Sequence, residues 1–196
     1  EVLAESIPKT SGNIVWANDN KHVFYSVKDK ALRDYKIFRH ELGTPVSQDV
    51  QVYHEKDEAF HTYVYKTRSE QFLVIGSSAT LSNEFRILEA AQPLGQFRLF
   101  HAREQKLEYE IDHHGDHWYV LTNADDAFNF KVMQTPITHT DRSNWRDYIP
   151  HKESVFIEGI DCFKDFMAIE QREGGNTRIR IRDWSVNEHV IVFEEK

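Results

Sequence analysis

Residues 109–123 read Tyr-Glu-Ile-Asp-His-His-Gly-Asp-His-Trp-Tyr-Val-Leu-Thr-Asn. Two short segments with aromatic and aliphatic residues flank a short polar turn at Gly115 and Asp116, which is typical of a β-hairpin. Three histidines and two aspartates in the same stretch are also residue types that bind metals. The rest of the chain decides between these interpretations, because the hairpin is one copy of a unit that occurs four times.

Strands and turns alternate along the whole chain, with almost no apolar spacing of the helical kind. The pattern predicts four groups of four strands. They are 14–17, 23–27, 35–40 and 50–53; 60–65, 72–75, 85–88 and 97–100; the two hairpin strands, 128–133 and 145–149; and 156–160, 166–169, 177–182 and 189–193.

Corresponding positions of these groups recur at a nearly constant spacing, which indicates an internal repeat. The second strands align at Val23, Phe72, Trp118 and Phe166, with spacings of 49, 46 and 48 residues. The third strands align at Ile37, Ile87, Val132 and Ile181, with spacings of 50, 45 and 49 residues. A cation precedes each member of the second column: Lys36, Arg86, Lys131 and Arg180.

Four short strands in each unit of just under 50 residues are typical of a β-propeller blade. We therefore expect an all-β fold, a β-propeller segment of about four four-stranded antiparallel blades. Residues 1–11 form a lead-in, and a partial propeller domain follows over 12–196, with blades at about 12–58, 59–106, 107–153 and 154–196. A β-sandwich is the alternative, but it does not require regular repetition.

Composition excludes several classes of protein. The formal net charge of −8 opposes binding to nucleic acid, and we interpret the arginines of 178–182 as the solvated face of a strand. No apolar run is long enough for a membrane helix. Cys162 is the only cysteine, which predicts a reducing compartment and a thiol that packs in the core. The chain begins at Glu1 without Met or a signal peptide, so we expect it to be part of something longer.

Several segments, in order along the chain, resemble the oligopeptidase B group of the prolyl oligopeptidase family of serine peptidases. They include Trp-Ala-Asn-Asp at 16–19, Phe-Arg-His-Glu-Leu-Gly-Thr-Pro at 38–45, Val-Tyr-His-Glu-Lys-Asp at 52–57 and Ser-Asn-Glu-Phe-Arg-Ile-Leu at 82–88. The hairpin and the segments 129–130, 149–151, 157–159 and 163–165 continue the series. The resemblance thus covers nearly the whole chain from residue 14 onward.

This resemblance implies a parent enzyme with an α/β-hydrolase domain, which carries a Ser-Asp-His triad, and a seven-bladed propeller that covers it. The family cleaves short peptides after Arg or Lys and excludes folded proteins. The present chain would supply about four blades from the middle of the propeller and none of the catalytic residues. The string closest to a Gly-x-Ser-x-Gly nucleophile elbow, Gly-Ser-Ser-Ala-Thr at 76–80, lacks the second glycine, and no helix is expected after it.

Two groups of polar residues are candidate sites. Asp112, His113, His114, Asp116 and His117 have the side chains of a zinc site, but adjacent strand residues point to opposite faces, so we expect a hairpin turn and no metal. The second group contains acids on the expected innermost strands: Glu110, Asp112, Glu158 and Asp161. These acids could face the pore and attract cationic peptides, or they could be solvated strand residues.

The leading hypothesis is a non-catalytic lid that limits access to a cytoplasmic oligopeptidase by size. Its partners would be the parent α/β-hydrolase domain and short basic peptides, with no cofactor, nucleic acid or membrane. The excised segment would expose sheet faces that are normally covered, so we expect it to form a homo-oligomer. An independent propeller module that binds other proteins is the alternative.

Overall fold

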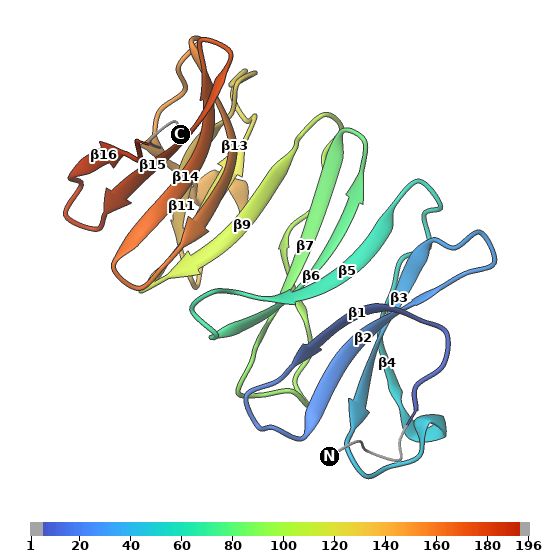
Figure 1. Ribbon diagram of the computed structural model, residues 1–196. Helices are drawn as coiled ribbons and strands as arrows, with labels where there is room; N and C mark the ends of the chain where they lie inside the picture. The colour runs from blue at the N-terminus through green and yellow to red at the C-terminus, as the bar shows by residue number, and fades with distance from the viewer. Residues whose placement is uncertain (1–5, 193–196) are drawn as a thin grey trace. The chain divides into compact units, whose positions relative to one another are not determined.

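The computed structural model describes residues 6–192 of the 196-residue chain. Nearly all of the regular structure is β, and it forms four four-stranded antiparallel sheets (Figure 1). The chain divides into two compact units, Glu1–Gln105 and Lys106–Lys196, and each unit contains two of the sheets. No helix in the described part of the chain is long and apolar enough to cross a membrane.

In the first unit, each strand pairs with its neighbour in the sequence. The first sheet contains β1 (Thr10–Trp16), β2 (His22–Lys28), β3 (Asp34–Glu41) and β4 (Val50–His54), with the 3-10 helix η1 (Val46–Gln48) before its last strand. The second sheet contains β5 (His61–Lys66), β6 (Phe72–Ala79), β7 (Ser82–Glu89) and β8 (Arg98–His101).

The second unit has the same sequential pairing. Its first sheet contains β9 (Tyr109–His114), β10 (His117–Thr122), β11 (Lys131–Pro136) and β12 (Arg146–Ile149), with the 3-10 helix η2 (Arg142–Asn144) before the last strand. Its second sheet contains β13 (Val155–Cys162), β14 (Phe166–Glu173), β15 (Asn176–Asp183) and β16 (Glu188–Val190). The propeller fold class expected from the repeats is confirmed by this repeated four-stranded sheet.

Several strands begin or end at other residues than expected, and two of the differences have clear local reasons. β1 begins at Thr10, four residues before the expected start, because a register shift between Thr10 and Ile14 lets the turn-like Ser-Gly-Asn segment continue the strand. β11 begins at Lys131 because Phe130, with a φ of 61°, belongs to a turn in which its N–H bonds to the Ala127 carbonyl. Of the expected strand 189–193, Phe193 lies outside the described residues.

Each unit has a core between its two sheets. In the first unit, Phe24, Ile37, Leu73 and Ile75 are almost fully buried together. In the second unit, Val132, Met167 and Ile169 are fully buried, and the free thiol of Cys162 packs with them. The core position expected for Cys162 is therefore confirmed. Six of the eight residues in the two repeat columns are buried, whereas Phe166 and Ile181 are half-buried.

The cations of the repeat column have local partners. Arg86 pairs with Glu84, and Lys36 lies over the Tyr35 ring. Lys131 lies 2.8 Å from Asp147 and 3.0 Å from Asp125.

We expected the three arginines of 178–182 to lie on a solvated strand face, and this expectation is wrong for two of them. The Arg180 and Arg182 side chains are only 14% and 17% exposed, because both pair with Glu188 and Arg182 also lies over the Tyr148 ring. Arg178 remains exposed. Ion pairing and ring contact permit a guanidinium group to lie at a sheet surface that is largely covered.

Candidate functional site

The β9–β10 hairpin forms as expected. Its strands pair in unbroken register from Tyr109 with Thr122 to His114 with His117, and Gly115 turns the chain with a φ of +59°. That φ is favourable for glycine, which has no Cβ. The hairpin therefore supplies a rigid frame on which the position of each polar side chain can be judged.

The two adjacent histidines of the hairpin lie on opposite faces of β9. His113 is fully buried against Trp118, with ring centroids 5.1 Å apart, and burial lowers the pKa of its imidazole to about 4. His114 stacks on Trp184 at 3.8 Å, and burial also lowers its pKa. Among residues 6–192, no three His, Cys, Asp or Glu side chains are placed to hold a metal ion.

Asp112 joins β9 and β13, which are the first strands of the two sheets in the second unit. We call the first strand of each sheet its inner strand. Its Oδ2 accepts a 2.7 Å hydrogen bond from the Cys162 N–H on β13, and its Oδ1 accepts one of 2.8 Å from the His113 N–H. The residue is only 8% exposed. Asp112 therefore acts as a clamp between β9 and β13, which is a structural role that the sequence did not reveal.

The first unit has a similar clamp on its own inner strands. The Asn13 side chain on β1 donates to the Val64 carbonyl at 3.0 Å and accepts from the Val64 N–H at 2.8 Å. It thereby imitates the pairing of a neighbouring strand and satisfies both backbone groups of one residue on β5. In both units, a polar side chain on one inner strand holds the backbone of the next.

Replacing Asp112 with alanine is expected to destabilise the second unit by about 1–3 kcal/mol, since the buried Cys162 N–H loses its acceptor. Denaturant unfolding measures this loss. Asp112→Asn keeps an acceptor oxygen and should cost less than alanine. Asp116→Ala, in the exposed turn of the same hairpin, is the matched control. Equal stability of Asp112→Ala and Asp116→Ala would contradict the clamp.

The other predicted acids occupy different environments. Glu110 is exposed on the same face of β9 as Asp112, and desolvation by neighbouring protein atoms raises the pKa of its carboxyl group. Glu158 lies at a bulge of β13 and pairs with Arg172 at 2.7 Å. Asp161 is half-buried on the same strand. The structure thus places these acids on β9 and β13, the first strands of the two sheets in the second unit.

The serine string at 76–80 lies within and at the end of β6, and no helix follows it before β7. Ser77 is fully buried, and its hydroxyl donates to the Tyr53 hydroxyl oxygen at 3.1 Å. The Ser78 Oγ accepts a 2.8 Å bond from the Asn83 amide. Neither hydroxyl stands at the strand-to-helix turn that a nucleophile elbow requires.

The first unit contains a buried charge network that the sequence did not reveal. Arg103 Nη2 lies 2.6 Å from Glu55 Oε2 and 3.4 Å from Glu84 Oε1. The Arg103 N–H also donates to Glu84 at 3.2 Å, and its guanidinium carbon lies 3.7 Å from the centroid of the Phe60 ring. Glu55 and Glu84 are only 4% and 7% exposed, so the network links the two sheets of the unit.

Both carboxylates of this network are held in the ionised form. Burial alone would raise the pKa of Glu55, but hydrogen bonds from Arg103, Tyr53 and the backbone N–H of Asp57 outweigh it and lower the pKa to about 2. For Glu84, hydrogen bonds from Arg86 and Arg103 likewise outweigh burial and lower the pKa. No local signal could have identified the network, because Glu55 and Arg103 are 48 residues apart.

Comparison with known proteins agrees with this fold. Residues 1–196 match the family model described as "Prolyl oligopeptidase, N-terminal beta-propeller domain". Dipeptidyl aminopeptidase BI of Pseudoxanthomonas mexicana is 37% identical over 182 residues, which are 92% of this chain and 25% of the relative. Protease 2 of Moraxella lacunata is 28% identical over 181 residues, which are 91% of this chain and 26% of the relative.

Two solved structures superimpose over essentially the full chain. Oligopeptidase B from Leishmania major has a TM-score of 0.90 and 30% identity, with coverage of 100% of this chain and 29% of the other. Oligopeptidase B from Trypanosoma brucei with covalently bound antipain has a TM-score of 0.92 and 28% identity, with coverage of 99% and 29%. The chain spans about a quarter of the length of the curated relatives that it matches.

Proposed function

Because the chain belongs to the prolyl oligopeptidase family through its N-terminal β-propeller domain, we propose that it is the propeller part of a serine peptidase acting on short peptides. The match of the family's propeller model to residues 1–196 carries this proposal. The similarities to named peptidases do not favour a stand-alone module for protein binding.

The proposed mechanism is steric. The propeller covers the catalytic α/β-hydrolase domain of the parent protein, so flexible peptides reach the catalytic centre and folded proteins do not. The described residues contribute β-sheets, inner-strand clamps and a buried charge network, which are suited to a rigid cover. We assign no catalytic residue and no cofactor to this segment, and we propose a cytoplasmic location that cell fractionation would test.

We further propose that the parent enzyme cleaves after Arg or Lys. The likeness to protease 2 and to two oligopeptidase B structures supports this specificity. The 37% identity to dipeptidyl aminopeptidase BI favours a second candidate, release of dipeptides from a free amino terminus.

Assays of the complete gene product distinguish these activities. Amino-terminally blocked fluorogenic peptides with Arg or Lys before the scissile bond test the first, and unblocked dipeptide substrates test the second. Under the first proposal, we expect faster cleavage of the blocked basic substrates than of the unblocked dipeptide substrates. A serine-directed covalent inhibitor should abolish the activity, and a folded protein that contains the cleaved peptide sequence should not be cut. Cleavage of only the unblocked dipeptide substrates would replace the first proposal with the second, and cleavage of folded protein would refute the size filter.

The inner-strand acids are proposed to attract basic peptides through their negative field. In the complete enzyme, Glu158→Lys is expected to lower kcat/KM for an arginine peptide by about threefold at low salt, and less at high salt, because salt screens exposed charges. Glu153→Lys, on the exposed connection before β13, controls for the change in net charge. Equal kcat/KM values in the two variants would remove Glu158 from this role.

The isolated 196-residue chain is proposed to form a homo-oligomer. On the last sheet, Ile179 and Ile181 lie half-buried on the face opposite the core, and Phe156 is 36% exposed. Apolar surface of this kind favours association. Light scattering across micromolar concentrations should show a dimer or larger species, and a monomer throughout would contradict the proposal.

A further inference from the structure

A cavity of about 230 Å³ lies in the second unit, against the core-facing side of the last sheet. Its apolar wall is formed by Ile149 at the end of β12 and by Val155 and Ile157 on β13, all of them buried. This volume is smaller than that of a typical drug-binding pocket. The cavity therefore suits a small ligand.

Gln171 on β14 lines this cavity and is only 5% exposed. Its Oε1 is buried without a hydrogen-bond partner among residues 6–192. A buried amide without a partner is costly, whichever way its oxygen and nitrogen are turned. An amide or peptide group of a ligand would satisfy it, since such a group both donates and accepts.

Arg180 supplies a second unsatisfied group to the same cavity. Its Nη1 lies 3.1 Å from Glu188 Oε2, and its Nε is buried without a partner within the described part of the chain. An N–H of this kind donates to an oxygen. The cavity thus offers both an acceptor and a donor that residues 6–192 leave without a hydrogen bond.

Charged side chains of both signs surround these groups. Lys152 and Arg180 are positive, whereas Glu173 and Glu188 are negative, and all four line the cavity. Lys152, Glu173 and Glu188 are exposed, so they mark its open side. Balanced charges near an apolar wall favour a zwitterion over an anion or a cation, because each end of a zwitterion meets an opposite charge.

We propose that this cavity is a binding site for a small zwitterion that carries an amide group, namely an amide amino acid such as glutamine or a dipeptide. The ammonium group pairs with Glu173, the carboxylate faces Lys152, and the amide bonds to Gln171. Such molecules include products of peptide cleavage. That link rests on the proposed function, whereas the binding itself does not.

Calorimetric titration of the complete protein tests the proposal after its catalytic serine has been blocked covalently. The probes are L-glutamine and Ala-Ala, with L-alanine as the zwitterion without an amide and acetamide as the amide without charges. Saturable binding of either amide-bearing zwitterion, tighter than both controls, is expected. Gln171→Leu should weaken it about tenfold by removing the amide while filling similar space, and Gln134→Leu, outside the cavity, should not.

Unchanged binding in Gln171→Leu would overturn the proposal. The proposal would also fail if neither L-glutamine nor Ala-Ala bound up to its solubility limit, and if crystals soaked in these probes showed only water in the cavity. Should Gln171→Leu not fold, Glu173→Gln provides a second test, because it removes the charge that pairs with the ammonium group and leaves the apolar wall intact. Unchanged binding in Glu173→Gln would overturn the proposal as well. Failure of peptide cleavage by the unblocked enzyme, with binding retained, would count against the proposed function alone.

Discussion

Arg103→Met is expected to destabilise the first unit by about 3 kcal/mol at neutral pH, at the lower end of the range for breaking a buried ion pair. The substitution retains much of the contact with the Phe60 ring but removes the charge. Glu55 and Glu84 are then left nearly buried without the cation that bridges them. The lower end applies because the Arg103 side chain is 27% exposed, so solvent screens part of the interaction.

The free energy of unfolding of Arg103→Met should also depend less on pH than that of the wild type. The Glu55 carboxyl has a folded-state pKa of about 2, below its ordinary value of 4.5, so the folded state binds fewer protons than the unfolded state between these values. The stability that Glu55 contributes is therefore present above pH 4.5 and is lost as the pH falls toward 2. In Arg103→Met this contribution is largely absent, so wild type and variant should converge in acid.

Urea unfolding at neutral pH and near pH 3 measures both effects. Lys56→Met is the matched control, because it also replaces a cation with methionine but at an exposed position next to Glu55. Its stability should remain within about 0.5 kcal/mol of wild type. A loss in Arg103→Met that equals that of Lys56→Met, or that does not shrink in acid, would show that the buried network contributes no stability.

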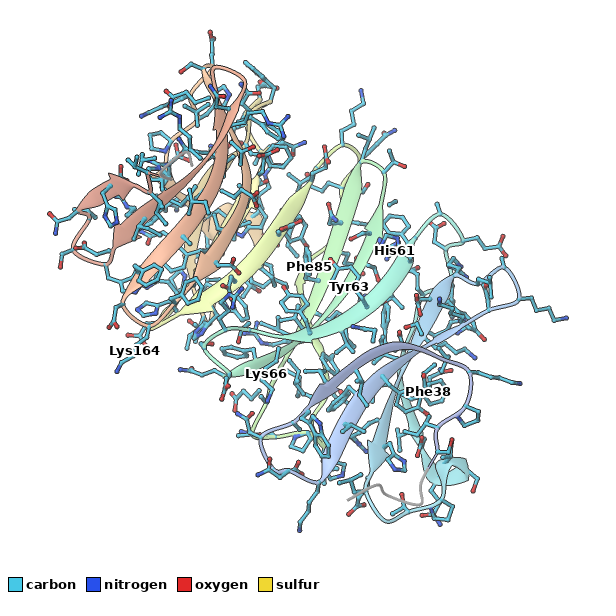
Figure 2. All side chains as sticks on the ribbon, viewed as in Figure 1. Phe38, His61, Tyr63, Lys66, Phe85 and Lys164 are labelled. Carbon is cyan, nitrogen blue, oxygen red and sulfur yellow. The ribbon has the colours of Figure 1, made fainter. Side chains whose placement is uncertain are left out.

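Gly76→Ala is expected to destabilise the first unit by about 1–3 kcal/mol through overpacking. A Cβ at this position of β6 would lie 2.5 Å from Cζ and 2.7 Å from Cε2 of Tyr63, which pairs with Gly76 across β5 and β6. Figure 2 labels Tyr63 on β5 together with His61. The Tyr63 ring has limited room to move, because it lies beside the rings of His61 and Tyr65 at centroid distances of 6.1 and 6.2 Å.

A double-mutant cycle with Tyr63→Ala isolates the clash. Gly76→Ala should cost much less in the Tyr63→Ala background, since the opposing ring is gone. Gly159→Ala is the control: it also lies in a strand, but the nearest atom to its added Cβ is a Glu170 carboxylate oxygen at 3.9 Å. Equal costs for Gly76→Ala with and without Tyr63, measured by urea unfolding, would rule out this explanation.

Local patterns predicted most of the fold. The hairpin at 109–123 formed as expected because the preference of aromatic and β-branched residues for strands and the chemistry of the turn act between close neighbours in the chain. The boundaries at Thr10 and Lys131 were displaced because a bulge and a turn depend on backbone geometry that residue types do not specify uniquely. Arg180 and Arg182 were assigned to a solvated face because the sequence did not reveal their contacts with Glu188.

The sequence by itself determined an all-β chain of four repeated sheets, since the strand pattern and the repeat spacing can be read directly from the order of the residues. Only the tertiary structure decided which polar groups meet. The Glu55–Arg103, Asp112–Cys162 and Asn13–Val64 contacts span 48, 50 and 51 residues. Such contacts depend on how two complete sheets pack together. The residues next to each partner in the sequence indicate only that a strand forms there, and they do not indicate which distant residue it will contact.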